Sequence, residues 1–204
     1  MLGKDEVLPH TEPLHPLIYD ALQRAINDYY TRIEPCFSNP YKRMRAGTIS
    51  NLANEFLSDS CANDPRFHTE FKYERVLVYV GDTGICLRLK KLTPSPELRS
   101  RNIPTQQSLQ FEQQQGEQMY FPFCAPPTNL TAGYVLDELT GEFDVYLTCP
   151  GANGNAWDYQ IEGRVALSIV QAPTMRKKSE EGWKRRDEDR DADVGKKQSG
   201  GNKE

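Results

Sequence analysis

The stretch that decides the fold is Tyr73–Leu92, which reads YERVLVYVGDTGICLRLKKL. Two runs rich in β-branched, aromatic and aliphatic residues, 73–80 and 85–92, flank the turn Gly81-Asp82-Thr83-Gly84. Such residues favour strands, and a short glycine-containing loop between two of these runs is typical of a β-hairpin. The sequence therefore predicts an antiparallel hairpin here.

Side chains alternate in character along the second strand of this hairpin. The apolar set is Ile85, Leu87 and Leu89. The more polar set, which alternates with it, is Cys86, Arg88 and Lys90. Because successive residues of a strand point to opposite faces, the first set predicts a face packed on the core. The second set predicts a polar face in contact with solvent.

Two amphipathic helices precede the hairpin. Apolar residues recur in pairs four residues apart from Leu17 to Ile33, with Pro16 suited to the first helical position and Pro35 ending the helix. A second apolar stripe runs from Ile49 to Cys61. The order of helices first and strands afterwards is typical of an α+β fold.

The segments after the first hairpin predict more strands and one short helix. Residues 92–103 read as a proline-containing loop, and 104–115 as a short glutamine-rich helix. A second hairpin is expected from 132–137 and 142–149, followed by a strand over 156–162. The run 165–170 fits a strand or a helix. We therefore expect N-terminal helices packed on an antiparallel sheet of about five strands, built from two hairpins.

Composition divides the chain into three parts. Residues 1–13 are polar and proline-punctuated and predict a flexible arm, and residues 14–172 predict a single α+β domain. Residues 173–204 hold ten Lys/Arg and eight Asp/Glu with few apolar side chains, which predicts a disordered charged tail. Trp183, within it, is either a docking residue of a linear motif or simply tolerated.

The cysteines and the amino terminus indicate a cytoplasmic protein. The five cysteines are widely spaced and form no Cys-x-x-Cys pair, and residues 1–16 do not resemble a signal peptide. No apolar run approaches the length of a membrane span. We expect a soluble protein with reduced thiols and no membrane association.

The sequence lacks the common motifs for catalysis, metal binding and cofactor binding. The sequence has no Gly-x-Ser-x-Gly elbow and no P-loop, and its three histidines are too scattered for a zinc site. His10 and His15 are expected to be solvated residues of the arm. Cys149 is the thiol most worth testing, although nothing nearby in the sequence would activate it. We predict no catalytic residue, no metal site and no cofactor.

A basic cluster is the strongest candidate for a binding site. Five cations fall within fourteen residues against the single acid Glu97: Arg88, Lys90, Lys91, Arg99 and Arg101. Such a cluster fits a contact with a protein partner or with nucleic acid phosphates, and equally a solvated sheet face. Residues 1–172 carry a net charge of −6, which argues against a dedicated duplex-DNA binder.

A metal-dependent nuclease is the sharpest enzymatic alternative. Asp82 at the hairpin tip and Lys90 in the next strand resemble the carboxylate–lysine arrangement of the restriction-endonuclease-like family. The sequence departs from that pattern at Arg88, where the motif has an acid.

Several short phrases resemble a family of small bacterial proteins. They are LRLKKL (87–92), RNIPTQQ (101–107), TNLTAGY (128–134) and TCP (148–150), with Trp157 beyond. Genes of that family often lie beside a helix-turn-helix repressor and a zinc metallopeptidase of the ImmA/IrrE type. The resemblance covers residues 14–162 and implies a mobile-element, phage-defence or toxin–antitoxin-like module with a protein partner encoded nearby.

These observations lead to two functional hypotheses. The first is a non-enzymatic regulatory or interaction protein that binds a protein partner through the polar face of the first hairpin and residues 99–107. The second is a nucleic-acid-binding protein or divalent-metal-dependent nuclease that uses the same face.

Overall fold

The computed structural model describes residues 1–38, 40–72, 75–100, 105–114, 128–137, 140, 142–151 and 154–163. All of them belong to one compact unit, Met1–Ala172. The predicted tail 173–204 with Trp183, the run 165–170 and Arg101 lie outside the described residues.

In the described part of the chain, six strands form one sheet in the order of the sequence. They are β1 (Phe67–Lys72), β2 (Arg75–Val80), β3 (Ile85–Lys91), β4 (Thr128–Leu136), β5 (Phe143–Gly151) and β6 (Gly154–Ile161). The α+β class is confirmed, and both predicted hairpins are present as β2–β3 and β4–β5. The sheet has one strand more than expected, because the polar segment FHTEFK pairs with β2 as β1.

The sheet is mixed, and the prediction of a purely antiparallel sheet is wrong. Strands β3 and β4 are parallel, with Ile85 opposite Thr128 and Lys91 opposite Tyr134. All other neighbouring strands are antiparallel. A parallel neighbour requires the chain to cross from one end of the sheet to the other. The sequence signals for two hairpins therefore do not determine whether the neighbouring strands of the two hairpins pair in parallel or antiparallel.

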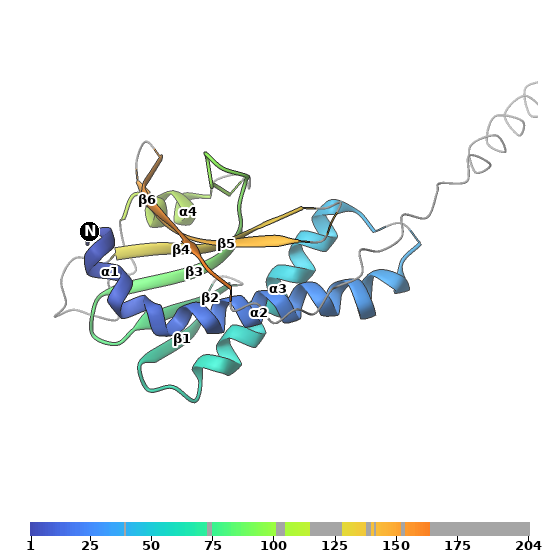
Figure 1. Cartoon of the computed structure of the whole chain (residues 1–204), viewed down its shortest axis with the longest axis horizontal. Coiled ribbons are helices and arrows are strands. Elements are labelled where there is room, and N and C mark those ends of the chain that lie inside the picture. The colour runs from blue at the N-terminus through green and yellow to red at the C-terminus, as the bar shows by residue number, and fades with distance from the viewer. Residues whose placement is uncertain are drawn as a thin grey trace, which may run out of the picture. The chain divides into compact units, whose positions relative to one another are not determined.

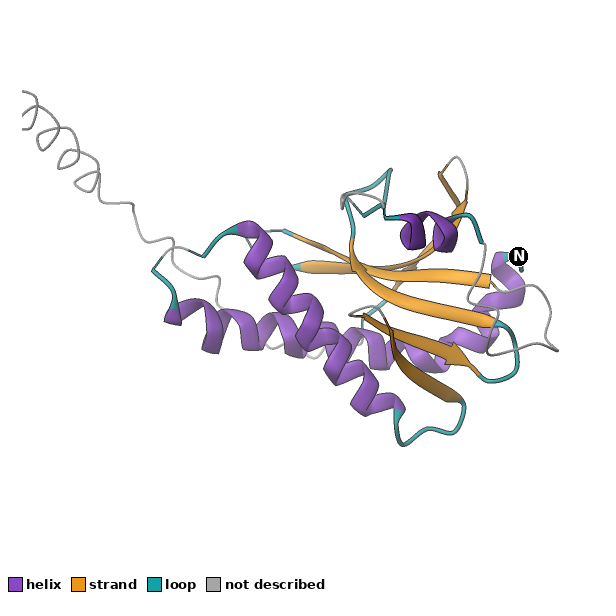
Figure 2. Cartoon of the chain, turned by 180° about the vertical axis from the view of Figure 1, so that it is seen from behind, coloured by secondary structure: helices purple, strands orange, loops and turns teal. Residues whose placement is uncertain are grey.

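Helices cover the two faces of the sheet unequally. Helices α1 (Lys4–Thr11), α2 (His15–Asp28) and α3 (Lys42–Cys61) lie on one face, and the short helix α4 (Gln106–Glu112) lies on the other (Figures 1 and 2). The turn η1 (Glu12–Leu14) joins α1 to α2, and α2 continues into the π-helical turn η2 (Tyr29–Ile33) and the 3₁₀ turn η3 (Glu34–Cys36). No helix in the described part of the chain has the length and apolar character needed to cross a bilayer.

The main core lies between the sheet and α1–α3. The stripes predicted for the two long helices are buried, as are the predicted inward residues of β3: Ile18, Leu22 and Ile26 of α2, Ile49 and Leu57 of α3, and Ile85, Leu87 and Leu89. Leu130 of β4 and Leu147 of β5 complete the layer at the centre of the sheet. Period-3.6 and period-2 patterns therefore located the core face correctly.

Residues 1–13, predicted as a flexible arm, form part of this core instead. Val7 and Thr11 have no exposed surface. The amide of Leu2 donates to Thr128 Oγ1 at 2.9 Å, and Lys4 Nζ donates to the backbone carbonyl of Asp158 at 3.0 Å. The segment is therefore attached to the carboxyl-terminal half of the sheet.

His15, predicted to be solvated in that arm, is buried as well. It is 9% exposed, its Nε2 lies 3.3 Å from Thr11 Oγ1, and its ring centroid is 5.6 Å from that of Tyr159. Burial lowers the pKa of His15, against the raising effect of Glu12.

Val7→Ala tests whether α1 contributes to the fold. Because Val7 is fully buried, we expect the free energy of unfolding to fall by about 2 kcal/mol in urea titrations. The exposed His10→Ala on the same helix is the control and should change stability little. Equal stability of the Val7 variant and the wild type would mean that the segment behaves as a free arm.

Candidate functional site

The face of the sheet that carries α4, called the α4 face below, holds a small second core. Leu77 and Tyr79 of β2, Cys86 of β3 and Phe111 of α4 form it. Thr105 caps the helix, since its hydroxyl accepts a hydrogen bond from the amide of Ser108 at 3.2 Å. The face predicted to be open to solvent is therefore covered over β2 and β3.

Arg88 lies beneath this helix and is only 2% exposed. Its Nε donates to Thr131 Oγ1 at 3.3 Å, and its Nη2 donates to Glu112 Oε1 at 3.1 Å. A weaker contact joins Nη1 to Ser108 Oγ at 3.5 Å, and the guanidinium carbon lies 4.0 Å from the centroid of the Phe111 ring. The expectation of a solvent-exposed Arg88 is wrong, because a long alternating strand does not reveal what packs on its polar side.

Arg88 remains charged at neutral pH although it is buried. Burial lowers its pKa to about 10, and the carboxylate of Glu112 opposes that shift. A buried arginine is tolerated where its N–H groups have partners and an aromatic ring covers its face.

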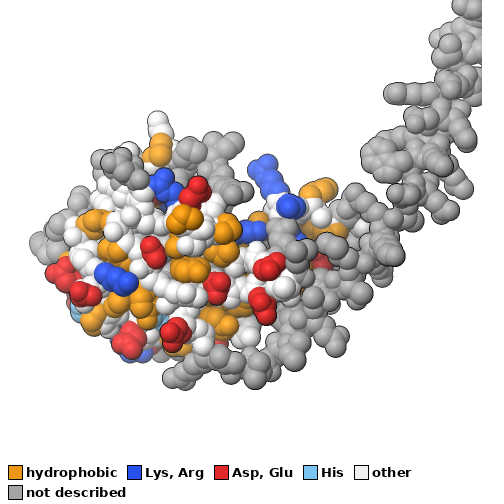
Figure 3. All heavy atoms as spheres, turned by 45° about the horizontal axis from the view of Figure 1, so that its top comes forward, with side chains coloured by type: hydrophobic (Ala, Val, Ile, Leu, Met, Phe, Trp, Pro, Cys, Tyr) orange, Lys and Arg blue, Asp and Glu red, His pale blue; other side chains and the backbone are white. Residues whose placement is uncertain are grey.

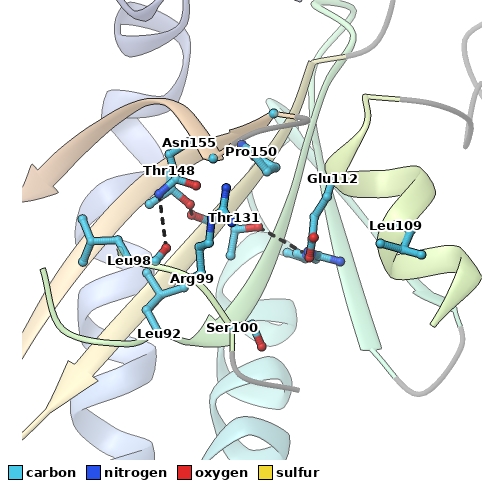
Figure 4. Close-up of a pocket in the computed structure, with 13 residues that line it drawn as sticks. Leu92, Leu98, Arg99, Ser100, Leu109, Glu112, Thr131, Thr148, Pro150 and Asn155 are labelled. Atoms are coloured by element: carbon cyan, nitrogen blue, oxygen red, sulfur yellow. Dashed lines mark hydrogen bonds and ion pairs between the residues drawn. The ribbon is translucent and has the colours of Figure 1, made fainter. Parts of the chain in front are cut away.

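A cavity of about 230 Å³ opens beside Arg88 (Figure 4). Its walls come from the loop after β3, from α4, and from β4, β5 and the start of β6. The lining residues are Arg88, Leu92, Leu98, Arg99, Ser100, Leu109, Glu112, Thr131, Thr148, Pro150, Gly151, Gly154 and Asn155. Segments far apart in the sequence thus meet at one place.

Hydrogen bonds hold the loop that brings Arg99 to this cavity. The amide of Thr93 donates to the carbonyl of Arg99 at 2.8 Å, and the amide of Arg99 donates back to Thr93 Oγ1 at 3.0 Å. Asn155 Nδ2 donates to the carbonyls of Glu97 and Leu98, both at 3.3 Å, which ties the loop to β6. The Arg99 side chain remains exposed at the rim.

Gly154 makes room for Arg99. Its φ is +146°, and an added Cβ would lie 2.9 Å from Arg99 Nη2. A larger residue would be strained in this backbone conformation and would displace the guanidinium. The glycine therefore helps to fix where the rim charge lies.

Among the described residues that line the cavity, the charged ones are Arg88, Arg99 and Glu112. Glu112 is already bonded to Arg88 and accepts from Ser108 Oγ at 3.2 Å, so its charge is largely satisfied. The hydroxyl of Thr148 is also occupied, donating to the carbonyl of Thr131 at 3.2 Å. The cavity therefore presents excess positive charge within a partly apolar wall, which suits an anionic group attached to an apolar stem.

The structure brings together part of the predicted basic cluster. Arg88 and Arg99 line the same cavity, and Lys90 lies two residues beyond Arg88 on the α4 face. Lys91 alternates to the other face, where it is half-buried. Figure 3 shows acidic side chains spread over the surface that it presents and basic ones at few places.

Asp82 and Lys90, the two residues of the nuclease hypothesis, lie at different places along the first hairpin. Asp82 lies exposed in the turn, while Lys90 is five residues beyond Ile85 along β3, about 16 Å at 3.3 Å per residue. Within the described ranges, no group of three His, Cys, Asp or Glu side chains could hold a metal ion.

Cys149, the thiol singled out in the sequence, is fully buried in the main core, on the face of the sheet that α1–α3 cover. Burial raises its pKa to about 11, so the thiol remains protonated at neutral pH. Gln114 Nε2 lies 3.6 Å from its sulfur.

Two polar residues that sequence reasoning missed position the site. Gln114 accepts from the amide of Asn129 at 2.7 Å and donates to the carbonyls of Asn129 and Pro150, which ties the end of α4 to β4 and β5. Asn155 ties the Arg99 loop to β6 in the same way. An isolated Asn or Gln in a loop carries no signal of this kind in a single sequence.

Comparisons with protein-family models, with curated proteins and with solved structures found no match to this chain. The bacterial family resemblance accordingly stays a prediction.

Replacing Arg88 and Arg99 one at a time should show that Arg88 contributes to stability and that Arg99 contributes little. We expect Arg88→Ala to lower the free energy of unfolding by about 3 kcal/mol, because it leaves Glu112 without its cation and removes the contact with Phe111. Arg88→Met, which keeps most of the volume, should be milder. Arg99→Ala should change stability by less than about 0.5 kcal/mol, since its side chain is exposed. Urea unfolding measures all three, and equal effects at both arginines would contradict the assignment.

The surroundings of Lys90 lead us to expect that the free energy of unfolding depends on pH. Burial, together with the charges of Arg88 and Arg75, lowers its pKa to about 8, against the raising effect of Glu112. An unfolded lysine has a pKa of about 10.4, so between these values the unfolded chain binds the extra proton. The Lys90 contribution to stability therefore increases as the pH rises through this window.

The Lys90→Met variant should lack this increase. We also expect it to be more stable than the wild type at pH 7, by roughly 0.2–1 kcal/mol, because a like-charge contact is removed. The measurement is the difference in unfolding free energy between variant and wild type at pH 7 and pH 9.5. Lys91→Met is the control on the other face, and an identical pH response of the two variants would refute the prediction.

Proposed function

We propose that this chain is a non-enzymatic binding protein whose α4-face cavity receives an acidic side chain of a protein partner. The observation that carries the proposal is that buried Arg88 and exposed Arg99 line one cavity, and that Glu112, the acid among its described lining residues, is already bonded to Arg88. Arg99 is the residue whose N–H groups are accessible to a partner from outside.

The size of the cavity favours a side chain over a cofactor. Sites for small molecules and cofactors span about 300–1,000 Å³. The volume here is about 230 Å³, which is enough for one side chain of a docked segment.

The chemistry of the lining favours a carboxylate on an aliphatic stem. A guanidinium binds a carboxylate with two parallel hydrogen bonds, which a lysine ammonium does not reproduce. Leu92, Leu98 and Leu109 supply apolar surface around the two arginines, and Leu109 is 41% exposed. Aspartate, glutamate or a chain-terminal carboxylate of the partner fits this combination.

The biological setting follows from the family resemblance alone. A bacterial regulatory, mobile-element or defence module would place the partner among neighbouring gene products. The proposed chemistry adds that the partner presents an acidic segment.

The test is affinity capture from source cells with the full chain and two charge-reversal variants. We expect the wild type to retain one stoichiometric protein and Arg99→Glu to retain at least tenfold less, because a carboxylate at the rim repels an acidic group. Arg43→Glu is the matched control, since Arg43 is exposed at the start of α3 on the other side of the sheet.

Two outcomes would count against this function. Equal capture by wild type and Arg99→Glu would remove the cavity as the contact. Recovery of nucleic acid alone, with binding that weakens steeply as salt increases, would favour a nucleic-acid-binding function instead.

A further inference from the structure

We infer that a second site on the α4 face binds a phosphate-class oxyanion between Arg75 of β2 and Lys90 of β3. The inference goes beyond the proposed function, because neither residue lines the cavity that would receive a partner.

The observed pairing of β2 with β3 ends at Leu77 and Arg88, and extension of its register places the two cations across from each other. Leu77 pairs with Arg88, and continuing this antiparallel register by two residues brings Arg75 opposite Lys90. Leu77 and Arg88 both lie on the α4 face, and side chains two residues apart share a face. Both Arg75 and Lys90 are half-buried, so neither is simply extended into solvent.

Like charges directly opposite in an antiparallel pair destabilise a sheet. Here the positive charges of Arg88 and Arg75 both act on Lys90 and both disfavour its charged form. Among the described residues, the ion pairs are Arg32–Asp28, Arg66–Asp64 and Arg88–Glu112, and none involves Arg75 or Lys90. Glu112, the one acid whose charge acts on Lys90, is already bonded to Arg88 and Ser108.

The balance of charge selects the class of anion. Lys90 and the described groups whose charges act on it, Arg75, Arg88 and Glu112, together carry two net positive charges. A dianion such as phosphate or a phosphate monoester would neutralise them, whereas a carboxylate would neutralise only one. A planar guanidinium beside an ammonium is also a common combination for phosphate recognition.

The experiment is calorimetric titration of the full chain with inorganic phosphate at pH 7, with ionic strength held constant by sodium chloride. We expect saturable binding by the wild type and at least tenfold weaker binding by Arg75→Gln and by Lys90→Met. Both variants should fold, because each removes a like-charge contact rather than an ion pair. Arg43→Gln is the matched control for net charge and should bind phosphate like the wild type.

The outcomes separate this site from the partner-binding cavity. No saturable binding at millimolar phosphate, or an equal loss in Arg43→Gln, would overturn the inference. Arg99→Glu should bind phosphate normally, while Arg75→Gln should still capture the partner, so either proposal can fail alone. A single-stranded oligonucleotide that displaces phosphate would identify a nucleic acid backbone as the source of the anion, and failure to displace it would identify a small phosphorylated ligand.

Discussion

Parallel strands cannot be joined by a tight turn, and the parallel pairing of β3 with β4 is the constraint on which the α4 face depends. The chain leaves β3 at one end of the sheet and must enter β4 at the other. The described parts of this connection are the loop 92–100 and α4, and both lie on the side away from α1–α3 (Figure 2). A third hairpin at this point would leave Arg88 and Thr131 facing solvent. The crossover instead buries Arg88 and forms a cavity from its walls.

Burial of a charge in this way is tolerated only because its partners come from separate segments. Arg88 is bonded to Thr131 of β4 and to Ser108 and Glu112 of α4, while Phe111 covers its face. Gln114 in turn bonds the end of α4 to β4 and β5. The position of α4 and the charge of Arg88 are therefore mutually dependent: the helix satisfies the guanidinium, and the guanidinium holds the helix.

The sequence allowed prediction of the elements whose pattern is local. The apolar stripes of α2 and α3 and the alternation of Ile85, Leu87 and Leu89 reported the core face correctly, because each depends only on spacing along one element. The strand direction of β4 and the burial of α1 depend on contacts between distant segments. Periodicity says which face is polar, but not whether another segment covers it, and for that reason Arg88 was expected in solvent.

The same distinction applies to the site. The density of cations from 88 to 101 marked the region, and the structure places Arg88 and Arg99 on one cavity. Arg75 was not part of the predicted cluster, because its proximity to Lys90 arises from strand register and not from closeness in sequence. Asn155 and Gln114 position the cavity through side-chain bonds to backbone carbonyls. The sequence does not distinguish them from the many other polar residues that could make such bonds.

The hydrogen bond from Leu2, just before α1, to Thr128 of β4 limits the order in which the protein can fold as it is made. Leu2 and Thr128 are separated by 126 residues, and no contact between them can form until β4 has been synthesised. At translation rates of about 5–20 residues per second, that interval is roughly 6–25 s. During it, Val7 and Leu14 lack the strands that later cover them. This segment is thus synthesised well before the strand that it contacts, which makes it dependent on protection from premature association.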